Sequence, residues 1–147
     1  MRIALGADHA GYKIKEMIKK HLLKSGHRIE DFGTGSTESV DYPDFAFKVA
    51  ESVVRGDNQR GVLICWTANG MCISANKVRG IRAAICLNED MAILSREHND
   101  SNVLCLGSKF VSEDKIIPIV DIWLGTRFVG ERHQTRVNKI KNYEDRK

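Results

Sequence analysis

Short apolar runs alternate along this chain with longer segments in which hydrophobic residues recur every three or four positions. The runs have the length of buried strands, and the longer segments have the period of amphipathic helices. The pattern predicts strands at residues 2–6, 27–33, 61–65, 80–86 and 102–107. It predicts helices at residues 11–26, 43–56, 71–77, 89–96, 113–124 and 131–141, the last of them basic.

This alternation favours an α/β sandwich built on a mostly parallel sheet of about five strands. Residues 61–65 are apolar throughout, which is typical of a strand buried on both faces of a parallel sheet. In open sheets of this kind, ligands bind outside the carboxyl ends of the strands. The residues that follow the strands, together with His98 and Asn99 ahead of the last strand, are therefore the first candidates for a site.

Composition narrows the functional classes. The 147 residues are enough for one domain with its own core, and 42% hydrophobic and 29% charged residues are ordinary for a soluble protein. No apolar run approaches the ~20 residues of a membrane span, and Asp8 and His9 interrupt any signal peptide. The net charge of +4 lacks the interleaved aromatic residues of a nucleic-acid surface. We therefore expect a cytoplasmic protein that binds neither membrane nor nucleic acid.

Four cysteines occur without a C-x-x-C pair or zinc-site spacing, which favours reduced thiols over disulfides or a metal site. Cys65 differs from the other three because it ends a strand and precedes a short loop that leads into a helix. A helix N-terminus lowers the pKa of a nearby thiol, and loop amides can hold an oxyanion. The alternative is a buried structural cysteine.

Other polar residues also have two interpretations. Asp8 and His9 follow the first strand, where they could orient and protonate a ligand, but Asp8 could equally cap the next helix. Arg132 and Arg136 are four residues apart on one helical face, where they could bind one phosphate or simply be solvated. His98 lies in a polar segment expected to be a turn, where a histidine is usually exposed and without function.

In combination these residues resemble the B-type ribose-5-phosphate isomerases and their relatives, the galactose-6-phosphate and allose-6-phosphate isomerases. The matching stretches are ALGADHAGYKIKE, DFGT, SVDYPDFA, the run from Cys65 to ANKVRGIRAAIC, SREHNDSNVLCLGSKFV and GERHQTRV. The resemblance implies a single sugar-phosphate isomerase domain over residues 1–147, folded as a Rossmann-like three-layer αβα sandwich. It also implies a homodimer or homotetramer with active sites at the subunit interface, and a reaction that needs no metal or other cofactor.

The resemblance implies a role for each matching residue. Cys65 matches the base that removes the proton from carbon 2 of the opened sugar, and Thr67 and His98 match residues that assist ring opening. The other matches bind substrate. They are Asp8, Tyr42 and Asn99 at the sugar, the loop amides of Trp66, Ala68, Asn69 and Gly70 at the enediolate, and His9, Lys109, Arg132 and Arg136 at the phosphate.

The loop after Cys65 departs from the family pattern C-G-T-G-x-G-M at Trp66 and Ala68. Because Trp and Ala are poorly tolerated at positive φ, we expect both at ordinary negative φ, with Asn69 or Gly70 taking any unusual turn. We expect the indole to line the rim of the site. Lys109 stands where many members carry Arg, and Lys cannot make the bidentate contact of a guanidinium.

The leading functional hypothesis is metal-free interconversion of ribose 5-phosphate and ribulose 5-phosphate through an enediolate, as in the pentose phosphate pathway. A six-carbon substrate such as allose 6-phosphate or galactose 6-phosphate is the first alternative, which Cys65 disfavours because the hexose branch often lacks this cysteine. A non-catalytic module that binds sugar phosphates or nucleotides is the second, and a Cys–His thiol hydrolase is the third.

Overall fold

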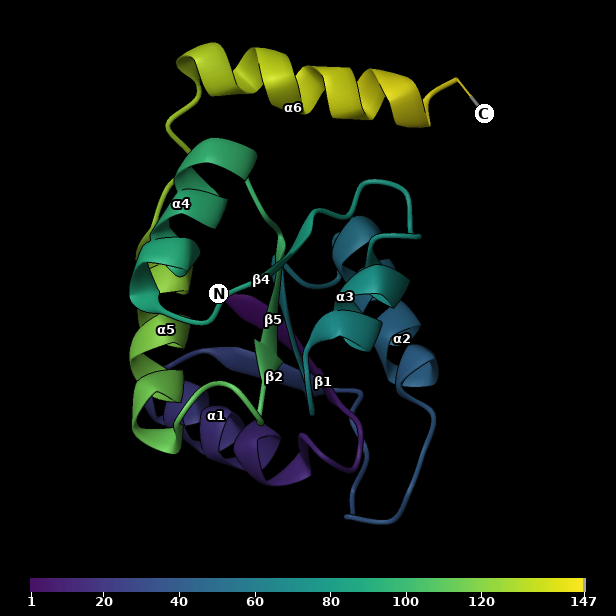
Figure 1. Ribbon diagram of the computed structural model, residues 1–147, viewed down its shortest axis with the longest axis vertical. Helices are drawn as coiled ribbons and strands as arrows, with labels where there is room; N and C mark the ends of the chain where they lie inside the picture. The colour runs from purple at the N-terminus through teal and green to yellow at the C-terminus, as the bar shows by residue number, and fades with distance from the viewer. Residues whose placement is uncertain (147) are drawn as a thin grey trace.

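The structure is a computed structural model that describes residues 1–146 as alternating strands and helices (Figure 1). The strands are β1 (Arg2–Ala7), β2 (Arg28–Asp31), β3 (Arg60–Cys65), β4 (Ala83–Ile85) and β5 (Val103–Gly107). The helices are α1 (Tyr12–Lys24), α2 (Tyr42–Val54), α3 (Asn69–Ala75), α4 (Glu89–Asn99), α5 (Glu113–Gly125) and α6 (Glu131–Glu144). The elements predicted from the hydrophobic pattern are therefore present in the predicted order.

The strands form one sheet in the order β2-β1-β3-β5-β4, and every pair is parallel. The predicted α/β fold is confirmed, with a sheet that is wholly rather than mostly parallel. From β1 the chain continues to β2 on one side, whereas from β3 it continues to β4 and β5 on the other side. The crevice of such a sheet opens where the direction changes, between the carboxyl ends of β1 and β3.

Helices cover both faces of the sheet and complete the predicted three layers (Figure 1). Helices α1, α4 and α5 pack on one face, and α2 and α3 pack on the other. Successive side chains of a strand point to opposite faces, so Val62 and Ile64 join the first layer while Leu63 and Cys65 join the second. Each fully buried Leu or Ile contributes about 1.5–3 kcal/mol. Cys65 therefore faces the layer that contains α3.

Helix α6 lies across the amino-terminal end of the sheet, as the uppermost helix in Figure 1. Of its side chains, His133 and Val137 are buried. At its carboxyl end, Arg79 pairs with Asp145, and the Gly80 amide donates to Glu144. The helix has a largely exposed surface.

Helix α4 is longer than predicted, and this changes the backbone conformation of two candidate residues. The hydrophobic period ends before residue 97, but α4 continues to Asn99. Its last turn is stabilised by Arg96, a buried side chain that donates to the Asp100 carboxylate and the Ser101 carbonyl oxygen. His98 and Asn99 are therefore helical rather than part of a turn. They lie at the amino-terminal edge of the sheet, just before β5 begins.

Candidate active site

The structure gathers most of the predicted site residues at the carboxyl edge of the sheet. They come from the ends of β1, β3 and β5 and from the start of α2, which the parallel topology brings together. We call this group the carboxyl-end cluster, which consists of Asp8, His9, Tyr42, the residues from Cys65 to Gly70, and Lys109.

Cys65 lies at the centre of the carboxyl-end cluster and is only 4% exposed. Burial raises the pKa of its thiol, and the negative charge of Asp8 acts in the same direction. Hydrogen bonds from the backbone amides of Met71, Ala68 and Thr67 to the sulfur oppose the increase without cancelling it. The prediction that the helix N-terminus leaves a lowered pKa is therefore wrong, because desolvation outweighs the amides.

Ala68 has a left-handed backbone, with φ at 69° and ψ at −24°, at the N-cap of α3. The prediction of negative φ at this position is wrong, and neither Asn69 nor Gly70 takes the unusual turn. The prediction is confirmed for Trp66, whose φ is not positive. The left-handed residue joins β3 to α3 so that amides on both sides of the turn reach the Cys65 sulfur. Glycine adopts this backbone angle more readily than alanine does, which gives a physical reason for the glycine that the resemblance implies at this position.

Gly70 allows Tyr42 to contact the Cys65 loop, which we define as residues 65–71. A Cβ atom at position 70 would lie 2.5 Å from Cζ of the Tyr42 ring, closer than such atoms approach. Tyr42 begins α2 and is 41% exposed. Its phenol ring therefore packs on the loop while part of the side chain remains exposed, and its role in binding substrate stays a prediction.

Asp8 and His9 shape the turn after β1. The Asp8 Oδ1 accepts hydrogen bonds from the amides of Ala10 and Gly11, both at 3.0 Å. Asp8 therefore stabilises the turn between β1 and α1, but its interpretation as a helix cap is wrong, because Gly11 is the N-cap of α1 and no side chain caps that helix. Asp8 also lies close enough to raise the pKa of Cys65. The Val40 amide donates to Nδ1 of His9 at 3.2 Å. A neutral His9 then carries its proton on Nε2, which makes that atom a donor.

Trp66 lies at the rim of the cluster, as predicted. Its side chain is 56% exposed, so the indole lies at the protein surface beside the buried Cys65. Lys109 places its Nζ 4.9 Å from the centre of the indole ring. The backbones of the two residues are also joined, because the Lys109 amide donates to the Trp66 carbonyl oxygen at 2.9 Å.

The remaining candidates lie at the opposite edge of the sheet. We call them the amino-end cluster, which consists of His98, Asn99, Arg132, His133 and Arg136. The rings of His98 and His133 are stacked with their centroids 4.1 Å apart and their planes 7° apart. Burial lowers the pKa of His133, and the positive charges of His98, Arg132 and Arg136 lower it further. The Arg136 guanidinium lies 3.5 Å from Nδ1 of His133.

Sequence reasoning gave no role to His133, although it lies between the two arginines in the matching stretch GERHQTRV. The available signal was its position three residues before Arg136, on the same helical face. The structure shows what this face does: it stacks a buried imidazole on His98 and so connects α6 to the end of α4.

The two clusters cannot act on one small molecule within a single chain. The five residues of β5 separate the two edges, which corresponds to about 16 Å at the rise of a parallel strand. Figure 1 shows the same separation, with α6 at the end of the sheet away from the carboxyl ends of the strands. Single-chain geometry therefore does not unite His98, Asn99, Arg132 and Arg136 with Cys65.

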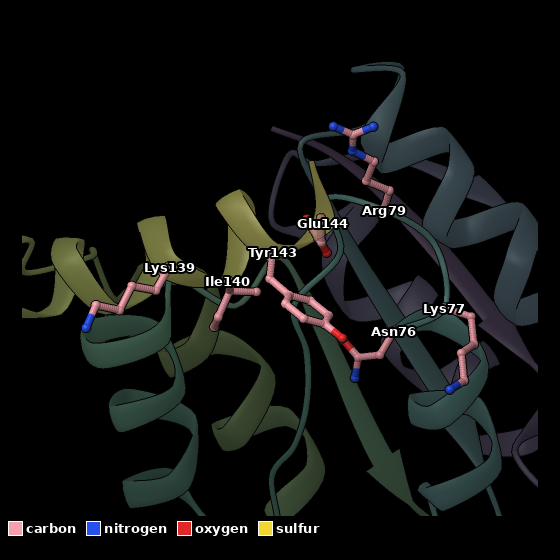
Figure 2. Close-up of a pocket in the computed structure, with 7 residues that line it drawn as sticks. All are labelled: Asn76, Lys77, Arg79, Lys139, Ile140, Tyr143 and Glu144. Atoms are coloured by element: carbon pink, nitrogen blue, oxygen red, sulfur yellow. The ribbon is translucent and has the colours of Figure 1, made fainter. Parts of the chain in front are cut away.

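A cavity of about 650 Å³ lies between α6 and the end of α3 (Figure 2). Figure 2 shows the Tyr143 ring extending from α6 toward Asn76, with Lys139 farther along the helix. The cavity is lined by Asn76, Lys77, Arg79, Lys139, Ile140, Tyr143 and Glu144. It adjoins the amino edge, so it is separate from the carboxyl-end cluster.

Three further observations concern general properties of the chain. All four cysteines are free thiols. Within residues 1–146, no three His, Cys, Asp or Glu side chains are grouped as a ligand set for a metal ion. No helix in that part of the chain is long and apolar enough to cross a membrane.

Comparison with known proteins places these features in context. The Ribose/Galactose Isomerase family matches residues 3–140. Ribose-5-phosphate isomerase B of Escherichia coli is 46% identical over 146 residues, covering 99% of this chain and 98% of that protein. Ribose-5-phosphate isomerase B of Clostridium thermocellum has a solved structure with a TM-score of 0.98 at 53% identity, and 99% of each chain is covered. The Mycoplasma genitalium enzyme, solved with bound ribulose 5-phosphate, has a TM-score of 0.95 at 42% identity, with 99% of this chain and 97% of that chain covered.

Proposed function

Because the chain belongs to the ribose/galactose isomerase family, we propose that it is a ribose-5-phosphate isomerase that uses Cys65 as its base. The observation that carries this proposal is the buried Cys65 thiol, which accepts hydrogen bonds from several backbone amides at the end of a central strand. Relatives that match nearly the whole chain are named ribose-5-phosphate isomerase B. The reaction is thus an aldose–ketose isomerisation, ribose 5-phosphate to ribulose 5-phosphate and back.

The proposed mechanism moves one proton between neighbouring carbons. The Cys65 thiolate takes the proton from carbon 2 of the opened aldose, and the electron pair shifts to the carbonyl oxygen of carbon 1 to form an enediolate. The thiol then returns the proton to carbon 1, and the proton of the carbon 2 hydroxyl passes to the oxygen of carbon 1, so that carbon 2 becomes the ketone, carbon 1 carries the hydroxyl and Cys65 is again a thiolate. A raised pKa makes the thiolate a stronger base, although a smaller fraction is ionised at neutral pH.

Backbone amides of the Cys65 loop would stabilise the developing oxyanion. Amides of Met71, Ala68 and Thr67 donate to the Cys65 sulfur, and the oxyanion is assigned to the other amides of the same loop, next to that sulfur. Preorganised donors of this kind are usually among the largest contributions to catalysis. Thr67, Asp8 and Tyr42 are assigned to the sugar. Every step is assigned to groups of the protein, without a metal or other cofactor.

Two copies of the chain would complete each site. Arg132 and Arg136 are suited to a phosphate, and His98 to ring opening, but all three lie about 16 Å from Cys65 along the strands. A two-fold dimer would place the amino-end cluster of one copy against the carboxyl-end cluster of the other, and would do so twice. His9 and Lys109 would then meet the phosphate from the Cys65 side.

The retained Cys65 thiol, with backbone amides donating to its sulfur, favours the catalytic over the non-catalytic alternative. The six-carbon alternative rests on the family, whose description includes galactose, whereas the relatives named above are ribose-5-phosphate isomerases. We therefore assign the five-carbon substrate.

The direct test is the conversion of ribose 5-phosphate to ribulose 5-phosphate by the purified protein, with allose 6-phosphate and galactose 6-phosphate assayed in parallel. Cys65→Ala should abolish turnover while substrate still binds. Cys72→Ala is the matched control, because this half-buried cysteine lies on α3 close to the same loop, and it should retain turnover. An active Cys65→Ala protein would remove Cys65 from the mechanism.

Mixing two variants, one without the base and one with weak substrate binding, tests the shared site. Cys65→Ala and Arg136→Ala chains would form mixed dimers in which one site contains both native residues. After subunit exchange at equal concentrations and low substrate, about a quarter of the wild-type activity should return. A mixture no more active than its components would show that each site is built within one chain.

A further inference from the structure

Trp66 and Lys109 form a cation–π pair beside the Cys65 loop. Their separation of 4.9 Å from Nζ to ring centre is within the ~6 Å over which the face of an indole attracts an ammonium group. The indole is 56% exposed and Lys109 is exposed as well. Because Trp66 directly follows Cys65, the pair places a positive charge at the mouth of the proposed site.

Backbone hydrogen bonds fix the positions of the Cα atoms of Trp66 and Lys109 relative to each other. The Ser108 amide donates to the Cys65 carbonyl oxygen and the Lys109 amide to the Trp66 carbonyl oxygen, each at 2.9 Å. Gly107 is paired with Cys65 in the sheet, and a Cβ atom at Gly107 would lie 3.0 Å from the backbone of the Cys65 loop. The two segments are therefore packed too closely to move independently, and their geometry brings the ammonium over the ring.

We propose that Trp66 is a positioning residue that holds the Lys109 ammonium in place to receive the phosphate of the substrate. This inference rests on the proposed function. A lysine side chain has several rotatable bonds and loses much rotamer freedom when it binds a ligand. An indole that already restrains the ammonium removes part of that loss before the substrate arrives.

The kinetic signature of this role is a change in KM without a change in kcat. Lys109 contacts a phosphate that is the same in the substrate and the transition state, so losing the contact weakens uniform binding. Lys109→Met should raise KM for ribose 5-phosphate about tenfold, as expected for one charge-assisted hydrogen bond. Trp66→Leu should raise KM about two- to fivefold, as expected for an exposed cation–π contact.

The double variant shows whether Trp66 acts by positioning Lys109 or by contacting the substrate itself. If Trp66 acts only through Lys109, Trp66→Leu should add nothing in the Lys109→Met background. Trp66→Phe should recover most of the affinity, because a phenyl face also attracts an ammonium. Phe110→Leu is the matched control: Phe110 is 59% exposed in the same segment, and its loss should leave KM unchanged. Additive effects of the two substitutions, or a fall in kcat with KM unchanged, would overturn the proposal.

Binding measurements separate this inference from the proposed function. In a Cys65→Ala background, calorimetry with ribose 5-phosphate should show the same order of affinities as the KM values, and ribose should show no dependence on Trp66 or Lys109. If the wild type fails to isomerise ribose 5-phosphate, the proposed function fails, while a Trp66-dependent affinity for the phosphate would still support the pair. Equal affinities in all variants would refute the pair even in an active enzyme.

Discussion

Ala68→Gly tests whether the left-handed backbone at the start of α3 is strained. An L-residue in this conformation costs about 1–2 kcal/mol, which glycine does not pay. The substitution also removes a fully buried methyl group, at a cost of about 0.8 kcal/mol. The greater freedom of glycine in the unfolded chain costs about 0.5–1 kcal/mol more. The contributions nearly cancel, and the free energy of unfolding should change by less than about 1 kcal/mol.

Ala50→Gly is the matched control. Ala50 is equally buried, lies inside α2 and has no positive φ. Here the same methyl group is lost, and glycine inside a helix costs about 1 kcal/mol relative to alanine. Ala50→Gly should therefore destabilise the protein by about 2 kcal/mol, with no strain to release.

The measurement is urea unfolding of the two variants and the wild type, followed by circular dichroism at matched protein concentration. The variants should differ by about 2 kcal/mol, or roughly 4–8 °C in melting temperature for a chain of this size. Equal destabilisation at the two positions would show that the left-handed conformation of Ala68 stores no strain. It would also remove the physical reason for glycine at this position in the family pattern.

Three other predictions follow from individual groups. Because burial raises the pKa of Cys65 above the ordinary 9.0, the rate of its alkylation by iodoacetamide should still be increasing above pH 9; a plateau by pH 8 would contradict this. Burial alone would raise the pKa of Asp31, but hydrogen bonds from Lys15 and Lys19 lower it. The ionised Asp31 carboxylate therefore stabilises the folded protein fully at pH values above its pKa in the unfolded chain. This stabilisation is lost as the pH falls through the lower pKa that Asp31 has in the folded protein. Asp31→Asn should cost on the order of 2–3 kcal/mol in urea unfolding at pH 7 and weaken this acid dependence. Arg136→Ala should raise KM for ribose 5-phosphate roughly ten- to hundredfold at similar kcat, and an unchanged KM would place the phosphate elsewhere.

The sequence was sufficient for the fold because its strands have a strong pattern. Residues 61–65 are apolar without interruption, and they form the central strand β3. Since parallel strands end at a common edge, the position of Cys65 after this run, and of Asp8 after β1, predicted that they would meet. The structure confirms that they do, with Asp8 close enough to affect the pKa of the thiol.

Other features depend on tertiary contacts, which the pattern of hydrophobic and polar residues does not reveal. The backbone angle of Ala68 contradicts its residue preference, because the connection from β3 to α3 imposes it. The direction of the pKa shift at Cys65 depended on whether burial or amide hydrogen bonds are stronger. The end of α4 was missed because buried Arg96 stabilises a polar helical turn. His98 was grouped with the carboxyl-edge residues for a different reason: it precedes β5 instead of following a strand, so it lies at the amino edge whether its segment is a turn or a helix.

The small buried face of α6 has a consequence for how the protein responds to dilution. With His133 and Val137 as its buried side chains, this helix should open locally at a much lower free energy than β3 or β5, and its amides should exchange hydrogen with solvent early. A second chain docked on the helix would slow that exchange by mass action. Because the helix carries both arginines assigned to the phosphate, dilution would cost the protein its substrate affinity well before it cost the protein its fold.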